Sequence, residues 1–144
     1  MKREIKFRAY SSHNHKMYPV SDIEWDADER MWVTADDGKN GIELIDEEAH
    51  LMQFTGLHDK NGREIYDSDI LKVTGEDGES YVATVKWFGD EDYPAFDLAG
   101  IPVAWNYDAN ALATIFQSGV ETCEVIGNIY EDGGLGDNKN SKTN

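Results

Sequence analysis

Three carboxylates that lie close together in the chain could take part in acid–base chemistry. Glu64, Asp67 and Asp69 fall within a stretch of six residues. If they converged on a cleft, one protonated and one ionised carboxyl group could act as general acid and general base in a hydrolysis. Exposed carboxylates in turns are much commoner than such pairs, and the sequence does not distinguish the two. A small carboxylate-using, hydrolytic enzyme is therefore kept as the alternative hypothesis.

The stretch that begins at Asp59 has some features of a calcium-binding loop. An EF-hand loop needs oxygen ligands at its first, third and fifth positions, glycine at the sixth and glutamate at the twelfth. Counted from Asp59, Asn61 meets the third requirement, but Arg63, Glu64 and Ile70 stand at the fifth, sixth and twelfth positions. The spacing therefore argues against this type of metal site.

Two histidines and one cysteine complete the set of residues with possible chemistry. His13 and His15 would share one face of a strand, but no third metal ligand lies near them in the sequence. Cys123 is the only cysteine, which excludes an internal disulfide and a thiolate zinc site. Its activation would need a histidine partner, for which His50 and His58 are candidates by count only. We expect a polar loop, a buried thiol, and no catalytic residue, metal or cofactor.

Composition points to one folded domain. The 144 residues are 40% hydrophobic and include four Trp, seven Tyr and five Phe, which is enough for a real core. No apolar run is long enough to span a bilayer and the start has no signal-peptide pattern. We expect a single domain over residues 1–132, a flexible tail over 133–144, and a cytoplasmic location.

The net charge of −16 is unevenly distributed. Residues 1–20 carry five basic side chains against one acidic side chain, whereas the remainder carries 8 basic and 28 acidic side chains. Most of the surface should therefore repel nucleic acid and can attract basic protein surfaces. Solubility alone would also explain such a charge.

The hydrophobic pattern predicts many short strands with about one helix, a mainly β (α+β) fold. Alternation over Glu4–Tyr10 and Tyr81–Phe88 is typical of half-buried strands, and in the second of these we expect Ala83, Val85 and Trp87 to face the core. The expected helix covers Asn106–Ser118, is capped by Asn106 or Asp108, and ends at Gly119. Further strands are expected at 23–25, 31–33, 42–45, 70–73 and 121–130.

The segment Asp59–Lys60–Asn61–Gly62 has the composition of a tight turn. Aspartate can accept a hydrogen bond from the backbone two residues further on, and Asn and Gly tolerate positive φ. A second turn is expected at Asp67–Ser68, after which Asp69 can cap turn amides. We therefore interpret this stretch as scaffold rather than as a catalytic or metal-binding strip.

Three blocks of the sequence together resemble the YopX family of small phage and prophage proteins of low-GC Gram-positive bacteria. The blocks are REIKFRAY near the start, LMQFTGLHDKNGREIYDSDIL in the middle and CEVIGNIYED near the end. The family pattern has Glu–Gly–Asp where this chain has Asp67–Ser68–Asp69, and commonly Trp at Tyr10. The resemblance implies a mainly β fold with a small barrel-like part and a phage-associated setting in the bacterial cytoplasm, but no activity. The motif residues expected to build the structural turn are Thr55, Gly56, Leu57, Asp59, Asn61, Gly62, Ile65, Tyr66 and Asp69.

The favoured hypothesis is a non-catalytic interaction or regulatory protein with an acidic surface. Its partner would be an unknown host or phage protein rather than nucleic acid or membrane. We also expect a homo-oligomer, because the basic first strand could contact the acidic face of a neighbouring copy. The residues expected at that interface are Lys2, Arg3, Ile5, Lys6, Phe7 and Arg8.

Overall fold

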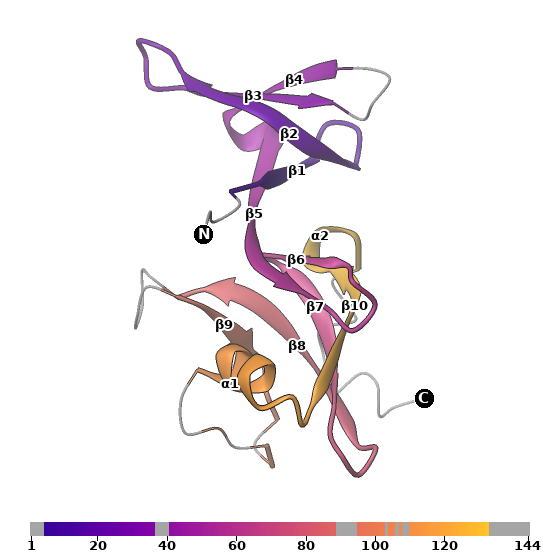
Figure 1. The fold of residues 1–144 in the computed structure, drawn as a ribbon. Coiled ribbons are helices and arrows are strands. Elements are labelled where there is room, and N and C mark those ends of the chain that lie inside the picture. The colour runs from indigo at the N-terminus through magenta and orange to yellow at the C-terminus, as the bar shows by residue number, and fades with distance from the viewer. Residues whose placement is uncertain are drawn as a thin grey trace. The chain divides into compact units, whose positions relative to one another are not determined.

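The computed structural model describes residues 5–36, 41–88, 95–102, 104–105, 107 and 110–132 (Figure 1). The chain divides into two compact units, Met1–Phe54 and Thr55–Asn144, and each is described by itself. The expectation of one domain over residues 1–132 stays a prediction. The expected tail over 133–144 lies outside the described residues.

The first unit is an antiparallel meander. Its elements are β1 (Phe7–Ser11), β2 (Lys16–Trp25), β3 (Met31–Asp36), β4 (Gly41–Ile45), the 3-10 turn η1 (Asp46–Glu48) and the first part of β5 (Ala49–His58). The strands are hydrogen-bonded in the order β4-β3-β2-β1-β5. The basic first strand, expected from Glu4, is described from Phe7 and lies between β2 and β5, so it is not an edge of the sheet.

One face of this meander forms a small core and the other faces solvent. Val33 lies opposite Leu44, and both are buried together with Ala9 and Ala49. Thr34, the next residue on β3, lies opposite the exposed Glu43. The alternation of strand side chains thus separates an apolar face from a polar, acidic one.

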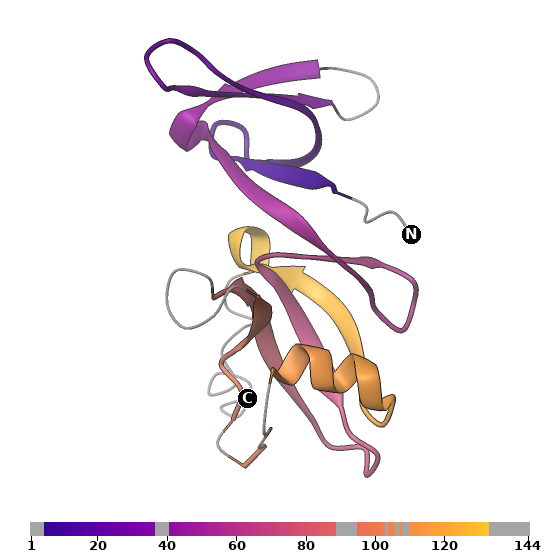
Figure 2. The ribbon, with the colours of Figure 1, turned by 60° about the vertical axis from the view of Figure 1, so that its left-hand side comes forward.

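The second unit is a four-stranded antiparallel sheet with a helix against one face (Figures 1 and 2). It contains the end of β5 and β6 (Glu64–Tyr66), β7 (Asp69–Thr74), β8 (Ser80–Trp87), β9 (Phe96–Ala99), α1 (Ala111–Ser118), β10 (Thr122–Asn128) and α2 (Ile129–Asp132). The strand order is β10-β7-β8-β9, and β5 pairs with β6. Leu112 and Ile115 of α1 pack on Leu71, Val73 and Val85 of the sheet.

The mainly β fold with one substantial helix is confirmed. The strands form two open sheets, and among the described residues no sheet closes on itself, so the barrel-like part of the expectation is not seen there. Closure would require the terminal strands of a sheet to pair with each other. In the four-stranded sheet these are β9 and β10, and each has a strand on one side only.

The start of the helix was predicted wrongly, whereas its end was predicted correctly. Helix α1 begins at Ala111, and Asn110 caps it by accepting a hydrogen bond from Ala113 N at 2.8 Å. Asn110 also donates its amide Nδ2 to the carbonyl of Phe96, which ties the helix start to β9. Asn106 and Asp108, the expected caps, lie outside the described residues. Gly119 ends the helix with φ 68°, as expected.

The ends of two strands also differ from the expectation. Ala83 and Val85 are buried, but Trp87 is 42% exposed and meets Phe96 edge-on at a centroid distance of 5.0 Å. Trp87 lies opposite Phe96, the first residue of the short strand β9, at the end of the sheet. The last strand stops at Asn128, because its side-chain oxygen accepts hydrogen bonds from Tyr130 N and Glu131 N of α2 and so turns the chain.

A backbone strain at Ser68 generates a testable prediction. Ser68 joins β6 to β7 with φ 75°, its N–H donates to Val85 O at 2.8 Å, and its carbonyl accepts from Ile129 N at 3.0 Å. These bonds hold a non-glycine residue in the left-handed region, at a cost of about 1 kcal/mol. Ser68→Gly should therefore raise the free energy of unfolding, measured by urea denaturation, by about that amount. Ser68→Ala retains the strain and should give no gain; equal gains from both variants would contradict this account.

Candidate functional site

The central sequence motif builds a hairpin loop between β5 and β6. Asp59 N donates to Arg63 O at 2.8 Å, and Gly62 N donates to Asp59 O at 2.9 Å. The Asp59 carboxylate oxygen Oδ1 accepts hydrogen bonds from the N–H groups of Asn61 and Arg63, both at 2.9 Å. Gly62 has φ 83°, a conformation that glycine adopts without strain. The aspartate and the glycine thus have local structural roles.

A loop of the same form closes a second hairpin, and the likeness of the two loops was not predicted. Between β2 and β3, Asp26 N donates to Arg30 O and Glu29 N donates to Asp26 O. Asp26 Oδ1 accepts from Asp28 N and Arg30 N, and Glu29 has φ 64° where the first loop has glycine. The spacing Asp-x-x-x-Arg, present at 26–30 and 59–63, is the signal in the sequence that could have revealed it.

Asp59 differs from Asp26 because it also reaches a distant strand. Its second oxygen, Oδ2, accepts a hydrogen bond from Val125 N on β10 at 2.8 Å, and Lys60 N donates to Cys123 O at 3.0 Å. Both β10 groups point away from β7, which pairs with the other side of that strand. The loop therefore closes the outer edge of β10.

The surroundings of Asp59 favour its ionised form. Burial opposes ionisation, but hydrogen bonds from the N–H groups of Val125, Arg63 and Asn61, together with the Arg63 charge, hold the pKa of Asp59 below its ordinary value. Asp59 is only 7% exposed and already accepts three backbone hydrogen bonds. It is a structural anion rather than a proton-transfer group.

Two further buried aspartates act in a similar way. Asp69, 1% exposed, accepts a hydrogen bond from Tyr66 N at 2.7 Å through Oδ2 and so caps the terminal strand β6. Asp97 Oδ1 accepts from Leu98 N on the outer edge of β9 and from Leu112 N in the first turn of α1. We call Asp59, Asp69 and Asp97 the edge caps, because each holds an N–H group of a terminal strand.

The remaining motif residues support these turns. The hydroxyl of Thr55 donates to Ile65 O at 2.8 Å, and Ile65 is fully buried in the core of the second unit. Leu57 packs against the same core. Gly56 has φ 91°.

The carboxylates of the enzyme hypothesis do not form an accessible set. Asp69 is buried in its cap, while Glu64 Oε1 accepts a hydrogen bond from the Tyr66 hydroxyl at 3.1 Å. Asp67 is half-buried in the turn before β7. The described hollows of the second unit are lined by other residues. The geometry therefore gives no support to a pair of these groups acting as acid and base.

Cys123 and His58 do share a hollow, but the thiol is not activated. The two residues line a depression of about 250 Å³ beside the end of α1. Burial, aided by the negative charge of Asp59, raises the pKa of Cys123 to about 11. A nucleophilic thiol needs the opposite shift. Cys123 is buried, as the sequence predicts.

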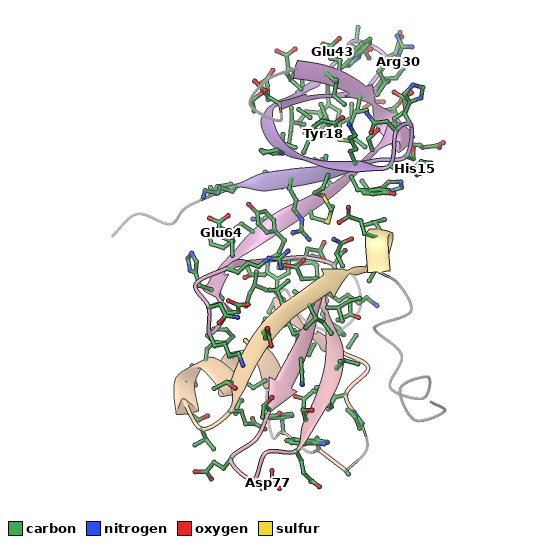
Figure 3. All side chains as sticks on the ribbon, turned by 90° about the vertical axis from the view of Figure 1, so that its right-hand side faces the viewer. His15, Tyr18, Arg30, Glu43, Glu64 and Asp77 are labelled. Carbon is green, nitrogen blue, oxygen red and sulfur yellow. The ribbon has the colours of Figure 1, made fainter. Side chains whose placement is uncertain are left out.

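His13 and His15 lie in the β1–β2 turn. Both are exposed, and His15 Nδ1 lies 3.3 Å from the Tyr10 hydroxyl (Figure 3). Within the described ranges, no group of three or more His, Cys, Asp or Glu side chains could hold a metal ion. Among the helices described, none is long and apolar enough to cross a membrane.

An acidic hollow near the tip of the β7–β8 hairpin was not predicted from the sequence. It measures about 460 Å³ and combines Trp105 and Glu121 with the turn residues Glu76, Asp77 and Glu79. Figure 3 shows Asp77 at this tip. Glu121 is held by the Tyr107 hydroxyl, which also bonds the Tyr81 hydroxyl at 2.7 Å. No local pattern relates residues 76–79 to 105 and 121, because the fold alone brings them together.

The residues expected at an oligomer interface are largely occupied within the chain. The ammonium group of Lys6 lies 5.7 Å from the centroid of the Phe54 ring, and Arg8 Nε donates to Met52 Sδ at 3.4 Å. Phe7 is half-buried in the central strand β1, whereas Ile5 is 67% exposed. Lys2 and Arg3 lie outside the described residues.

The solvent face of the first unit is acidic. In one row across the sheet, Asp22 on β2 lies opposite Thr34, which lies opposite Glu43 on β4. Glu24 and Asp36 occupy the same face in the adjoining rows, and all four acidic residues are exposed. We call Asp22, Glu24, Asp36 and Glu43 the acidic face. The neighbouring basic residue is Arg30, whose Nε lies 3.1 Å from Asp26 Oδ2. Its guanidinium group lies over the Trp32 ring.

The same substitution can be compared at the two loop aspartates. Asp59→Asn replaces an ionised acceptor of three backbone hydrogen bonds by an amide, whose NH2 group would face an N–H donor. We expect a loss of about 2 kcal/mol in the free energy of unfolding. Asp26 also accepts hydrogen bonds from Arg30 Nε and Trp32 Nε1, but all its bonds stay within its own hairpin and it is less buried than Asp59, so Asp26→Asn should cost less. Chemical denaturation of both variants measures the difference; equal losses would show that the contact with Val125 is unimportant.

The depressed pKa of Asp59 predicts a loss of stability in acid. A carboxyl group whose pKa is lower in the folded state stabilises the fold above its unfolded pKa, ordinarily 3.8, and this stability disappears as pH falls through the folded value. The stability difference between wild type and Asp59→Asn should therefore be largest above pH ~5 and shrink below pH ~4. Urea denaturation at a series of pH values tests this, and a constant difference would contradict it.

Comparison with known proteins places the chain in a family. No curated protein sequence matches it significantly. Its fold is similar to the crystal structure of protein EF1440 from Enterococcus faecalis, with 21% identity and a TM-score of 0.59 over 94% of this chain and 100% of that one. It is also similar to the crystal structure of YopX from Bacillus subtilis, with 20% identity and a TM-score of 0.52 over 90% and 96% of the two chains. The family model of the YopX protein matches residues 6–135, and the chain therefore belongs to the YopX family.

Proposed function

We propose that the protein is a non-catalytic interaction protein that binds a basic partner protein through the acidic face of its first unit. The partner would be encoded by the bacterial host or by a phage, and binding would take place in the bacterial cytoplasm. The family resemblance motivates this setting. The proposal names a mode of action and not a catalysed reaction.

The observation that carries the proposal is the arrangement of charge in the first unit. Asp22, Glu24, Asp36 and Glu43 occupy one exposed face, opposite the face that holds the apolar core. The neighbouring base Arg30 is engaged by Asp26. A surface of one sign attracts a surface of the opposite sign and accelerates their encounter.

The same charge argues against a nucleic acid as the partner. Phosphate backbones are bound by clustered Lys and Arg, and Lys6 and Arg8, from the basic start of the chain, make contacts within the chain. The buried aspartates argue against the enzyme hypothesis, because Asp69 of the proposed set is a cap with 1% exposure.

A double substitution tests which acidic surface binds. Asp22→Asn combined with Glu43→Gln removes two charges from the acidic face, and Glu76→Gln combined with Glu79→Gln removes two from the acidic hollow. Proteins captured from phage-infected or prophage-induced cells, identified by mass spectrometry, should include a basic protein. Its capture should be lost with the first variant, retained with the second, and weakened as salt rises.

Purified components complete the test. The captured basic protein should bind the wild type by calorimetry and bind the Asp22→Asn, Glu43→Gln variant at least about tenfold more weakly, an expected loss of about 1.4 kcal/mol. Equal affinity for both proteins, or a dependence on Glu76 and Glu79 alone, would contradict binding at the acidic face.

A further inference from the structure

Strand β4 presents an open edge in the described part of the first unit. It is a terminal strand, bonded to β3 on one side only. Ile45 N donates to the side chain of Glu48 at 2.9 Å, so the N–H of Ile45 points away from β3. Backbone direction repeats every two residues along an antiparallel strand, and both the N–H and the C=O of Glu43 therefore point outward as well.

The neighbouring strand confirms this orientation. Thr34 lies opposite Glu43, and its carbonyl accepts a hydrogen bond from the Ser21 hydroxyl at 3.2 Å, on the β2 side. The pair Thr34–Glu43 therefore exchanges no ladder bonds, and the outward groups of Glu43 are available to another strand.

The β4 edge is only partly closed by side chains. On each of the other terminal strands an edge cap holds one outward N–H group, that of Val125 on β10, Leu98 on β9 and Tyr66 on β6. At β4 only Ile45 has such a cap, from Glu48. Throughout the ranges that the structure describes, no side chain bonds to the outward backbone groups of Glu43. The unbonded outward N–H and C=O groups of Glu43 can therefore pair with an added strand.

The side chains of β4 define what an added strand would carry. Glu43 is exposed on the acidic face, in the same row as Asp22. Leu44, on the opposite face, is 3% exposed and belongs to the core, and Ile42 packs against that core. A neighbouring strand that alternates basic and apolar residues would place the bases beside Glu43 and extend the core beside Leu44.

We propose that the outer edge of β4 binds an extended segment of a partner protein as an additional β-strand, and that this segment alternates basic with apolar residues. The inference rests on the proposed function and gives it a binding mode. It also favours a segment of another protein over a second copy of this chain as the added strand. Self-pairing of β4 about Glu43 would place identical carboxylates side by side, which is destabilising.

The first experiment uses the full chain and a capped nine-residue peptide that alternates valine and lysine. Amide hydrogen exchange, followed by NMR, should show rapid exchange of the Glu43 N–H in the protein alone. Saturating peptide should slow this exchange by about tenfold or more, because the N–H becomes hydrogen-bonded. The same peptide with N-methyl groups on the residues that face β4 cannot pair and should give no protection. An unchanged exchange rate with the unmodified peptide would overturn the proposal.

Two variants of Glu43 separate backbone pairing from charge. Glu43→Pro removes the outward N–H without removing a bond to β3, and proline is tolerated at such edge positions. Glu43→Gln keeps the N–H and removes the charge. Glu43→Pro should abolish peptide binding, whereas Glu43→Gln should weaken it several-fold and retain the protection of residue 43. Unchanged amide protection of Leu44 in the proline variant would show that its sheet is intact.

The outcomes distinguish this inference from the proposed function. If Glu43→Gln abolishes binding as completely as Glu43→Pro, side-chain charge suffices: strand addition is overturned and the acidic-face function stands. If a valine–threonine peptide protects Glu43 as well as the valine–lysine peptide, the preference for a basic segment is overturned, and the proposed function with it. The N-methylated peptide keeps the test decisive if the proline variant does not fold.

Discussion

The carboxylate of Asp59 joins two parts of the second unit that are 66 residues apart in the chain. One oxygen shapes the loop between β5 and β6, and the other accepts the N–H of Val125 on β10. Because β10 carries Cys123 and Val125 into the core, the position of that strand against the loop depends on this contact. The contact is strong because the Asp59 carboxylate is ionised and buried. A hydrogen bond to a charged acceptor is stronger than one to a neutral acceptor.

The apolar pattern of the sequence predicted much of the fold, while the polar contacts that fix it were predicted only in part. Alternation around Ala83 and Val85 is a local property of a strand, so it identifies the buried face correctly. The start of α1 is not determined by local sequence, because several residues before it could cap a helix. Asn110 is selected by its second contact, with the carbonyl of Phe96. The central place of β1 likewise depends on distant pairing partners.

Buried aspartates are hard to recognise from sequence. Asp59 and Asp69 were expected to bond to turn amides, because such bonds span two to four residues. The contact between Asp97 and Leu112 connects two elements with no shared motif. The excess of acidic residues therefore has two different origins. Some aspartates bind backbone N–H groups inside the second unit, and other acidic residues, such as Asp22 and Glu43, face water on the first.

The repeated hairpin loop has a consequence for the order in which the chain folds. Loops at 26–30, 59–63 and 75–79 each close by a backbone N–H bond to a residue four positions away, and in each an aspartate side chain accepts a further backbone hydrogen bond. Such hairpins form locally within about 1–10 μs, because little chain entropy is lost. The bond from Val125 to Asp59 must close a far longer loop. We therefore expect the hairpins to form before β10 docks on the loop, so that the Asp59 carboxylate is already in place when its distant partner arrives.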